Sequence, residues 1–451
     1  MKIKFLGASS GIVTGSCYVL TSASGRSILI DLGMFQGIPD IEKLNYEPFN
    51  YDCKRIIGAV LTHAHLDHCG RLPILLPLGF NGDIWMTQAT RDLTELSLFD
   101  TAKIARNDGK PILFDKKLVE KTVTRFRSVN YHVPFQIGDF TISMYDAGHI
   151  LGSASLEIED KNPNSEIRKI VFSGDLGNSP EPLEKETEIF NDANAVVMES
   201  TYGDRIHPKE NPIEALQSEV NKIEVSGGTL LIPAFSLERT QELLHMIMHL
   251  KKANKVLAQT PFYLDSPMAE KATIIYTNYP KYFNSHIQDD LRYGSPFDFP
   301  NLNIIEDERQ SEGVHTQSGP KVIIAGSGMM TGGRIVNHAT YYLPIASTRL
   351  FIVGYQGEQT LGRELLEGNK KVIIDGLEME VKATVNDTQS LSSHADQHQL
   401  INWLTEIKNV KKIFITHGDD ISRQALAGKI TENLGIKNIT LPLLSQDAEL
   451  L

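Results

Sequence analysis

Hydrophobic positions in the first 200 residues form short runs that stop at glycine-rich, charged or histidine-bearing turns. The segment SCYVLTSASGRSILIDLG (16–33) has such a run on either side of Ser24-Gly25, which predicts a β-hairpin. Further strands are expected within RIIGAVLTHAH (55–65), DFTISMYDAGH (139–149), RKIVFSGDLG (168–177) and ANAVVMESTYG (193–203), each of which carries a short apolar run that stops at a charged or histidine-bearing turn. Between them, RLPILLPLGF (71–80) and ATRDLTELSLFDTAKIAR (89–106) have helical character.

After about residue 205 the pattern changes to longer alternating segments. Amphipathic helices are expected at 212–225 and 236–252, and short buried strands typical of a parallel sheet at 228–235, 261–266, 321–328 and 349–355. After about residue 378 a strand, a helix (394–407) and a second strand (411–419) follow. The simplest arrangement is an α/β fold in which residues 206–378 form one domain, inserted into another made by residues 1–205 and 379–451.

Composition is that of an ordinary globular chain. Of its 451 residues, 41% are hydrophobic and 22% are charged, so a sizeable core is expected. No apolar run approaches the roughly 20 residues of a membrane span, and the N-terminal MKIKFLGASSG has no secretory signal. Three cysteines without CxxC spacing favour a reducing compartment. We therefore expect a cytoplasmic protein with no membrane partner; the sequence is compatible with a monomer or a homodimer.

The net charge of −12 restricts how the chain could bind nucleic acid. Proteins that hold nucleic acid by bulk electrostatics are usually basic. Binding here would need a local cationic groove or bound metal ions.

The strongest chemical signal is the segment THAHLDH (62–68), directly after the apolar strand. His63 and His65 are two residues apart, so in extended chain they project from the same side, and Asp67 and His68 follow in the turn. Imidazole and carboxylate groups are ligands that zinc accepts, and four of them in six residues are too many for one closed site. The pattern suits two adjacent metal ions.

Three further residues follow strands in the same manner: His149, Asp175 and His417. Strand ends at one edge of a sheet converge on a single cleft, which favours one site. A lone histidine is more often structural or at the surface. His245 and His249 lie at i, i+4 on an expected helix without the glutamate of an HExxH motif, and we expect them to be structural or surface residues.

These motifs resemble a known family. THAHLDH, GHILGS (148–153), SGDLG (173–177) and THGD (416–419) resemble the metallo-β-lactamase superfamily. MESTYG (198–203), SSHADQ (392–397) and THGD narrow the resemblance to its β-CASP branch, which contains RNA-cleaving enzymes of the cleavage-and-polyadenylation and ribonuclease J types and DNA-processing relatives. The resemblance covers nearly the whole chain. It implies an αββα metallo-β-lactamase sandwich with an inserted α/β β-CASP domain, a parallel sheet flanked by helices.

The resemblance also implies two zinc ions per chain. His63, His65 and His149 would hold one ion, Asp67, His68 and His417 the other, and Asp175 would bridge both. Asp31, at the end of the expected strand ILID, would orient one of these ligands. A His/Asp donor set can also hold manganese or iron.

The activity implied is hydrolysis of RNA phosphodiester bonds by a two-metal mechanism. The resemblance implies in-line attack that leaves a 5′-phosphate and expels the 3′-oxygen, by endonucleolytic or 5′-to-3′ exonucleolytic cleavage or both. The expected catalytic residues are Asp67, Asp175, Glu199 and His394.

His394, held by Glu199, is the expected proton donor to the leaving oxygen. Without the resemblance, His394 would be interpreted as an N-terminal cap of its helix. RNA-acting members of the family carry histidine where His417 stands, whereas DNA-acting members tend to carry valine, so His417 favours RNA.

A glycine-rich loop, GSGMMTGGR (326–334), follows the strand KVIIA. Its backbone amides and Arg334 could cradle a phosphate, although the loop lacks the GK[ST] of a Walker A motif. By the resemblance, the loop faces the metal cleft, and a narrow groove between the domains would favour single-stranded RNA. The predicted phosphate contacts are Ser327, Gly328, Thr331, Gly332, Gly333 and Arg334, with Arg239 and Arg363 as weaker candidates.

Two alternatives remain besides a ribonuclease, with DNA processing as a lesser one. A hydrolase of a small ester, thioester or phosphodiester would not need the inserted domain or its glycine-rich loop. A catalytically silent RNA-binding scaffold would typically have lost metal ligands, and this chain keeps all seven together with Glu199 and His394.

Overall fold

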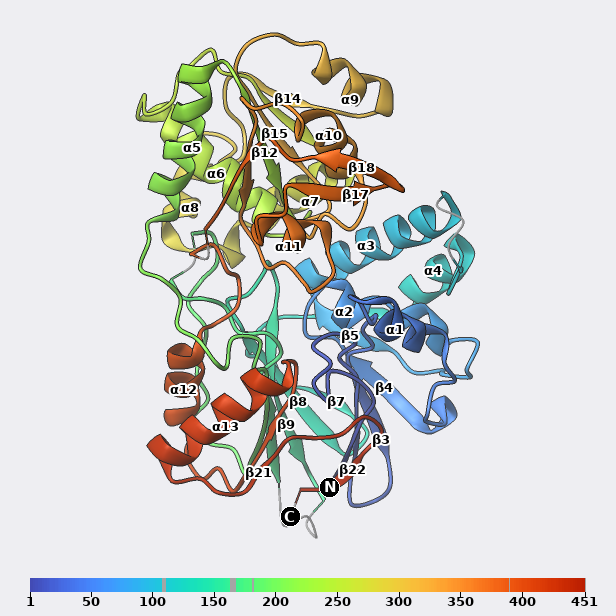
Figure 1. The fold of residues 1–451 in the computed structure, drawn as a ribbon. Helices are drawn as coiled ribbons and strands as arrows, with labels where there is room; N and C mark the ends of the chain where they lie inside the picture. Colours follow the sequence, from blue (N-terminus) through green and yellow to red (C-terminus); the bar gives the residue numbers. More distant parts are fainter. Residues whose placement is uncertain (108–110, 163–167, 181, 389, 451) are drawn as a thin grey trace. The chain divides into compact units, whose positions relative to one another are not determined.

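The computed structural model describes residues 1–107, 111–162, 168–180, 182–388 and 390–450 (Figure 1). The chain forms two compact units, the first made by Met1–Ile206 with Ser393–Leu451 and the second by His207–Ser392. The expected insert, 206–378, begins one residue before the second unit and ends earlier than it. The second unit extends further because β19 (Thr384–Asp387) pairs in parallel with β16 (Arg349–Ile352) in its sheet.

Two seven-stranded sheets form the centre of the first unit, as far as its residues are described. In sheet order, the first contains β22 (Asp447–Glu449), β1 (Lys2–Phe5), β2 (Tyr18–Thr21), β3 (Ser27–Ile30), β4 (Ile56–Val60), β5 (Ile84–Thr87) and β6 (Phe126–Val129). The second contains β21 (Ile439–Thr440), β20 (Lys412–Ile415), β11 (Ala195–Met198), β10 (Lys169–Phe172), β9 (Ala154–Asp160), β8 (Phe140–Asp146) and β7 (Phe135–Ile137). The predicted hairpin is confirmed, since β2 and β3 pair in antiparallel register.

Helices cover the outer face of each sheet in the first unit (Figure 1). The described helices of this unit are α1 (Pro39–Glu42), α2 (Leu66–Cys69), α3 (Gln88–Asn107), α4 (Lys116–Val123), α12 (Gln397–Thr405) and α13 (Asp420–Leu434), with 3-10 turns η1 (Lys43–Tyr46), η2 (Cys53–Arg55) and η3 (Leu72–Leu75). Phe5 of one sheet and Phe172 of the other pack in a core between the sheets. Leu98 of α3 packs in a cluster outside the first sheet, and Leu404 of α12 in one outside the second. The predicted αββα sandwich is confirmed.

One expected helix is only a short turn. The segment 71–80 forms η3, Leu72–Leu75, whereas the segment 89–106 lies within α3. Pro73 and Pro77 lack the amide hydrogens that an α-helix needs, which explains why the apolar run does not continue as a helix. Leu72 and Leu75 are nevertheless fully buried, so the turn adds to the core.

The second unit has a six-stranded parallel sheet, in the order β14 (Leu302–Ile304), β13 (Phe262–Asp265), β15 (Lys321–Ala325), β12 (Thr229–Pro233), β16 and β19, and a separate hairpin, β17 (Lys371–Ile374) with β18 (Leu377–Glu380). Its helices are α5 (Pro212–Ser226), α6 (Arg239–Lys252), α7 (Pro267–Thr277), α8 (Ser285–Leu291), α9 (Glu308–His315), α10 (Arg334–Tyr342) and α11 (Leu361–Leu366), with η4 (Pro280–Tyr282). Leu231 packs against α10, and its neighbours Leu230 and Ile232, which point to the opposite face, are also fully buried. Both faces of the sheet are therefore covered, as parallel sheets require.

In the part of the chain that the structure describes, no helix has both the length and the apolar character to cross a membrane.

Candidate metal centre

The motif THAHLDH lies where β4 leads into α2. His63 follows the buried strand, His65 occupies the N-cap of α2, and α2 carries Asp67 and His68. The backbone at Gly33 packs directly against the backbone of α2. A Cβ atom at Gly33 would lie 1.6 Å from the carbonyl oxygen of Asp67, so only glycine permits this approach.

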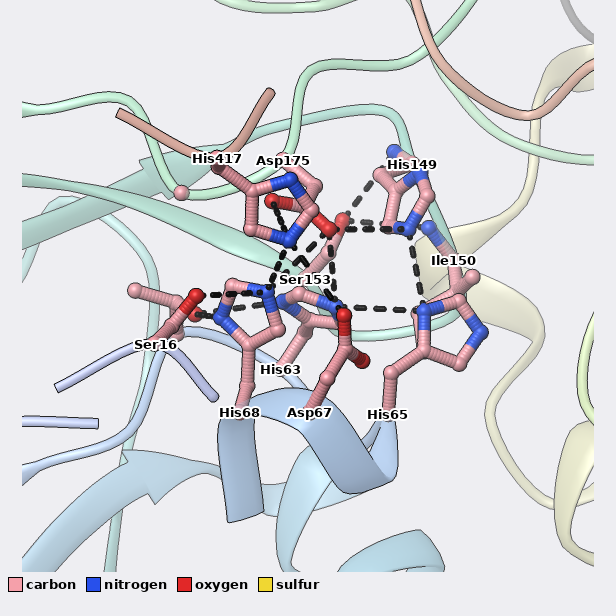
Figure 2. A network of polar contacts seen from close by, with 12 residues as sticks. Ser16, His63, His65, Asp67, His68, His149, Ile150, Ser153, Asp175 and His417 are labelled. Carbon is pink, nitrogen blue, oxygen red and sulfur yellow. Dashed lines mark hydrogen bonds and ion pairs between the residues drawn. The ribbon is translucent and has the colours of Figure 1, made fainter. Parts of the chain in front are cut away.

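Three imidazoles meet in one group (Figure 2). Nδ1 of His65 lies 3.2 Å from Nε2 of His63 and 3.1 Å from Nε2 of His149. Oδ2 of Asp175 lies 3.4 Å from Nε2 of His63 and 3.7 Å from Nε2 of His149. These side chains come from the ends of β4, β8 and β10, as the sequence pattern predicts.

A second group shares the same aspartate. Nε2 of His417 lies 3.1 Å from Nε2 of His68 and 3.3 Å from Oδ2 of Asp67. Asp175 is close to both groups, because its Oδ2 lies 3.2 Å from Nε2 of His68 and its Oδ1 lies 3.6 Å from Nε2 of His417. The seven predicted ligands thus gather in two adjacent groups with Asp175 between them (Figure 2).

Electrostatics in this site suits cations. Burial lowers the pKa of His63 and His149 well below their usual range, and that of His65 to about 4, so all three rings are neutral near pH 7 and offer lone pairs. Their nitrogens nevertheless face one another at hydrogen-bond distance. Among the described residues, Oδ1 of Asp175 is buried and accepts no hydrogen bond. Metal ions would bind these lone pairs and this oxygen, and the residues present therefore fit a metal centre.

In the second group, nearby carboxylates raise the pKa values of the histidines instead of lowering them. Burial opposes the charged form of His68, but Asp175 and Asp31 outweigh it and raise the pKa of His68 well above its usual range. Burial likewise raises the pKa of Asp175, but His417, His68 and His63 outweigh it and hold that pKa well below the usual range. This anionic carboxylate lies beside both groups, as a bridging ligand requires.

Hydrogen bonds behind the rings fix which nitrogen faces inward. Asp31, which is buried, accepts from the backbone N and Oγ1 of Thr62, each at 2.8 Å, and from Nδ1 of His68 at 2.7 Å. The Nδ1 of His149 donates to the carbonyl oxygen of Ser393 at 2.8 Å. With Nδ1 fixed as the donor, Nε2 is the nitrogen of each ring that faces the site; in His68 a metal ion would have to displace the proton from Nε2.

Glu199 and His394 form a pair beside the first group. Nδ1 of His394 lies 3.2 Å from Oε1 of Glu199, and the same oxygen accepts from the backbone N of Leu176 at 2.7 Å. The His394 side chain is 19% exposed, while that of Glu199 is fully buried. Burial lowers the pKa of His394, but the charge of Glu199 outweighs this and raises it to about 9. His394 is not the cap of its helix, because Asp396 caps α12 with Gln399.

The predicted phosphate contacts all lie in the second unit, and those of the glycine-rich loop lie around the turn between β15 and α10. Oγ of Ser327 accepts from the backbone N of Thr331 at 3.0 Å, and Gly333 caps α10 with a positive φ of 73°. Gly328 and Gly332 lie in the same turn; a Cβ atom at Gly328 would meet the ring of Phe235.

All three predicted arginines already contact carboxylates of their own unit. Arg334 pairs with Asp265, and Arg239, only 4% exposed, pairs with Glu242. The exposed Arg363 pairs with Glu367 at 2.7 Å. Their role in phosphate binding stays a prediction, and burial makes Arg239 the weakest of the three.

Two polar residues that position ligands were not predicted. Thr62 links Asp31 to the histidine motif, and Oγ1 of Thr201 lies 3.1 Å from Nδ1 of His417. Both stand inside the quoted motifs, next to His63 and two residues after Glu199. Their place in the motifs was the only signal available, since threonine in a turn usually serves the local backbone.

Comparison with protein families gives three consecutive matches. Residues 11–216 match the model of the metallo-beta-lactamase superfamily, residues 240–365 the Beta-Casp domain, and residues 378–442 the Zn-dependent metallo-hydrolase RNA specificity domain. The last match contains His394 and His417.

Individual relatives agree with these matches. The chain is 35% identical to ribonuclease TTHA0252 of Thermus thermophilus, over 93% of each chain, and 32% identical to RNase aCSPSF2 of Saccharolobus solfataricus, over 97% of this chain and 83% of that one. A crystal structure of a protein of unknown function from Enterococcus faecalis V583 shares the fold, with a TM-score of 0.54, 12% identity and 99% of both chains covered. The chain therefore belongs to the metallo-β-lactamase superfamily, in its β-CASP branch, and is a metal-dependent hydrolase.

Proposed function

We propose that this protein is a two-zinc ribonuclease that hydrolyses phosphodiester bonds of single-stranded RNA. The observation that carries the proposal is the arrangement of seven buried or half-buried ligands in two groups that share Asp175. Two adjacent cation sites with a shared carboxylate suit the displacement of one phosphate oxygen by another. The names of two relatives, a ribonuclease and an RNase, support RNA as the substrate.

We assign one ion to His63, His65 and His149 and the other to Asp67, His68 and His417, with Asp175 common to both. Zinc ions held there would supply Lewis-acid activation of water and of the phosphate. The ring orientation on which this depends is held by the side chains of Asp31 and Thr201 and by the backbone carbonyl oxygen of Ser393.

His394 supplies the proton that the leaving group needs. Cleavage of the bond between phosphorus and the 3′-oxygen leaves a 5′-phosphate on one fragment, and the expelled oxygen must gain a proton to become a 3′-hydroxyl. Glu199 holds Nδ1 of His394 at 3.2 Å and favours the protonated ring, so Nε2 is the atom that donates. The buried Glu199 is itself fixed by the backbone N of Leu176.

RNA is preferred over DNA in this proposal because His417 occupies the position where RNA-acting members of the family carry histidine. We retain the glycine-rich turn 326–334 and Arg334 as candidate phosphate contacts; Arg334 would have to exchange Asp265 for a phosphate. A cytoplasmic location is proposed from the cysteines, since Cys17, Cys53 and Cys69 are all unpaired and buried.

Cleavage of a 5′-labelled single-stranded RNA by the zinc-loaded protein tests the proposal, beside its Asp175→Ala variant and a DNA strand of matched sequence. Defined RNA fragments are expected, lost with Asp175→Ala and much weaker with DNA. The size of the fragments would separate internal cleavage from cleavage that proceeds from the 5′ end. Intact RNA despite bound zinc would refute the proposal and favour a small-substrate hydrolase or a silent scaffold.

A further inference from the structure

A third group of metal-ligand residues lies within the second unit. His245 and His249 are one turn apart on α6 and share a face of that helix, and Asp290 comes from α8. Nε2 of His249 lies 2.9 Å from Nε2 of His245 and 3.0 Å from Oδ2 of Asp290. Nε2 of His245 lies 3.2 Å from the same oxygen. Three donor atoms thus form a triangle with sides of 2.9–3.2 Å.

Hydrogen bonds cannot satisfy all three sides of this triangle. A neutral imidazole has one N–H group and one lone pair. If both rings carry the hydrogen on Nε2, both can donate to Asp290, but two N–H groups then face each other at 2.9 Å. If only one ring carries the hydrogen on Nε2, the Nε2 lone pair of the other ring faces the negatively charged carboxylate, which repels it. A cation among the three atoms removes the conflict, because all of them then present lone pairs to it.

We propose that His245, His249 and Asp290 bind a divalent transition-metal ion, with zinc as the expected ion, at a site of the second unit. Two imidazoles and a carboxylate are a donor set that zinc accepts, and water can complete the coordination. The absence of an HExxH glutamate excludes only a protease-like site. The proposal goes beyond the expectation of structural or surface residues, because it assigns a metal ion to the two histidines.

Exposure around the group suits an ion that enters from solvent. The side chain of His249 is 44% exposed, whereas those of His245 and Asp290 are 10% and 19% exposed. The ion thus has an entry path on the side of His249. Nζ of Lys252 lies 3.6 Å from Oδ1 of Asp290, which leaves Oδ2 as the oxygen directed at the histidines.

The bound ion would tie α6 to α8. The chain between these helices, residues 253–284, includes β13, α7 and η4, so the ion would close a long segment. Binding to the folded state alone stabilises that state. The site is therefore structural and independent of the proposed ribonuclease activity.

Metal content measured on the full chain tests this site. Protein stripped of metal is dialysed against zinc, and bound zinc is counted by mass spectrometry for the wild type, His249→Ala, Asp290→Asn and Asp289→Asn. Asp289 is the matched control, an exposed carboxylate next to Asp290 that pairs with Arg292. Since only differences between variants are compared, the number of ions in the first unit does not affect the result.

We expect His249→Ala and Asp290→Asn each to bind one zinc ion fewer per chain, and Asp289→Asn to bind as many as the wild type. Zinc should raise the melting temperature of the wild type more than that of His249→Ala. Equal zinc content in the wild type and in either site variant, folded as judged by circular dichroism, would overturn the proposal. So would an equal loss in Asp289→Asn. Truncation of the half-exposed His249 should not prevent folding, and Asp290→Asn gives a second, nearly isosteric variant.

Discussion

Asp31 should control zinc affinity without touching zinc. Its Oδ2 accepts hydrogen bonds from Oγ1 of Thr62 and Nδ1 of His68, and its Oδ1 accepts from the backbone N of Thr62. The substitution Asp31→Asn replaces one of these oxygens by an NH2 group. If the remaining oxygen serves the backbone N, the NH2 group faces Nδ1 of His68. The ring can then accept at Nδ1 only by moving its hydrogen to Nε2, where the lone pair for the metal is lost.

The expected loss of zinc affinity follows from this change in the hydrogen bonding of His68. Loss of an orienting partner of a metal-bound histidine typically costs about 10- to 100-fold in metal affinity, or about 1.4–2.8 kcal/mol. Metal-free Asp31→Asn should also unfold more easily by about 1–3 kcal/mol, because a buried donor loses its acceptor.

Competition with a chelating dye measures the zinc affinity, and urea unfolding of the metal-free protein measures the stability. Asp115→Asn is the control, since Asp115 caps α4 through the backbone N of Leu118. Zinc affinity of Asp31→Asn within twofold of the wild type would refute the reasoning.

Three further predictions concern single residues. His394→Ala should slow RNA cleavage by about 10²- to 10⁴-fold with zinc content unchanged. The control His398→Ala, on the exposed face of α12, should cleave RNA at the wild-type rate. Full turnover of His394→Ala would exclude the role of His394 as proton donor. Gly33→Ala should lower the melting temperature by several degrees or prevent folding, because its Cβ atom would overlap the carbonyl oxygen of Asp67 in α2. In the control Gly428→Ala the Cβ atom meets nothing within 4 Å, so its melting temperature should match or exceed that of the wild type. Burial raises the pKa of Asp146 from 3.8 to about 7, so ionisation costs the folded state stability as pH rises between these values. Asparagine does not ionise, so the free energy of unfolding of Asp146→Asn, measured in urea, should rise relative to that of the wild type by on the order of 4 kcal/mol as pH increases across that window. A stability advantage of Asp146→Asn that shrinks as pH rises would contradict this.

The clustering of the candidate metal ligands was predictable because these residues follow strands. His63, His149 and Asp175 each come shortly after a short apolar run. β8 and β10 lie in one sheet and β4 in the other, and the residues that follow these strands meet at one edge of the sandwich. Pattern and resemblance together therefore predicted the two-sheet sandwich, which is confirmed, and the seven candidate ligands, whose role as metal ligands stays a prediction. The hairpin at 16–33 was predicted for a similarly local reason, a glycine turn between two β-type runs.

Features that depend on distant partners were not predictable. Asp290 lies in a polar stretch far along the chain from His249, and nothing in the local pattern indicates that α8 packs beside α6. The carboxylate that pairs with Arg334, Asp265, stands at the end of another strand. The end of the inserted unit was also missed, because the strand Thr384–Asp387 is short, has Val385 as its single apolar residue, and joins the sheet only as an edge strand.

The central proposal is that two metal ions, held by seven side chains of the first unit, drive cleavage of RNA. The most direct measurement adds zinc stepwise to metal-free His249→Ala protein, in which the site of the second unit is removed, and follows cleavage of a 5′-labelled single-stranded RNA. Cleavage should be absent without metal and should reach its maximum when two equivalents are bound. Full cleavage without metal, or intact RNA with two zinc ions bound, would contradict the proposal.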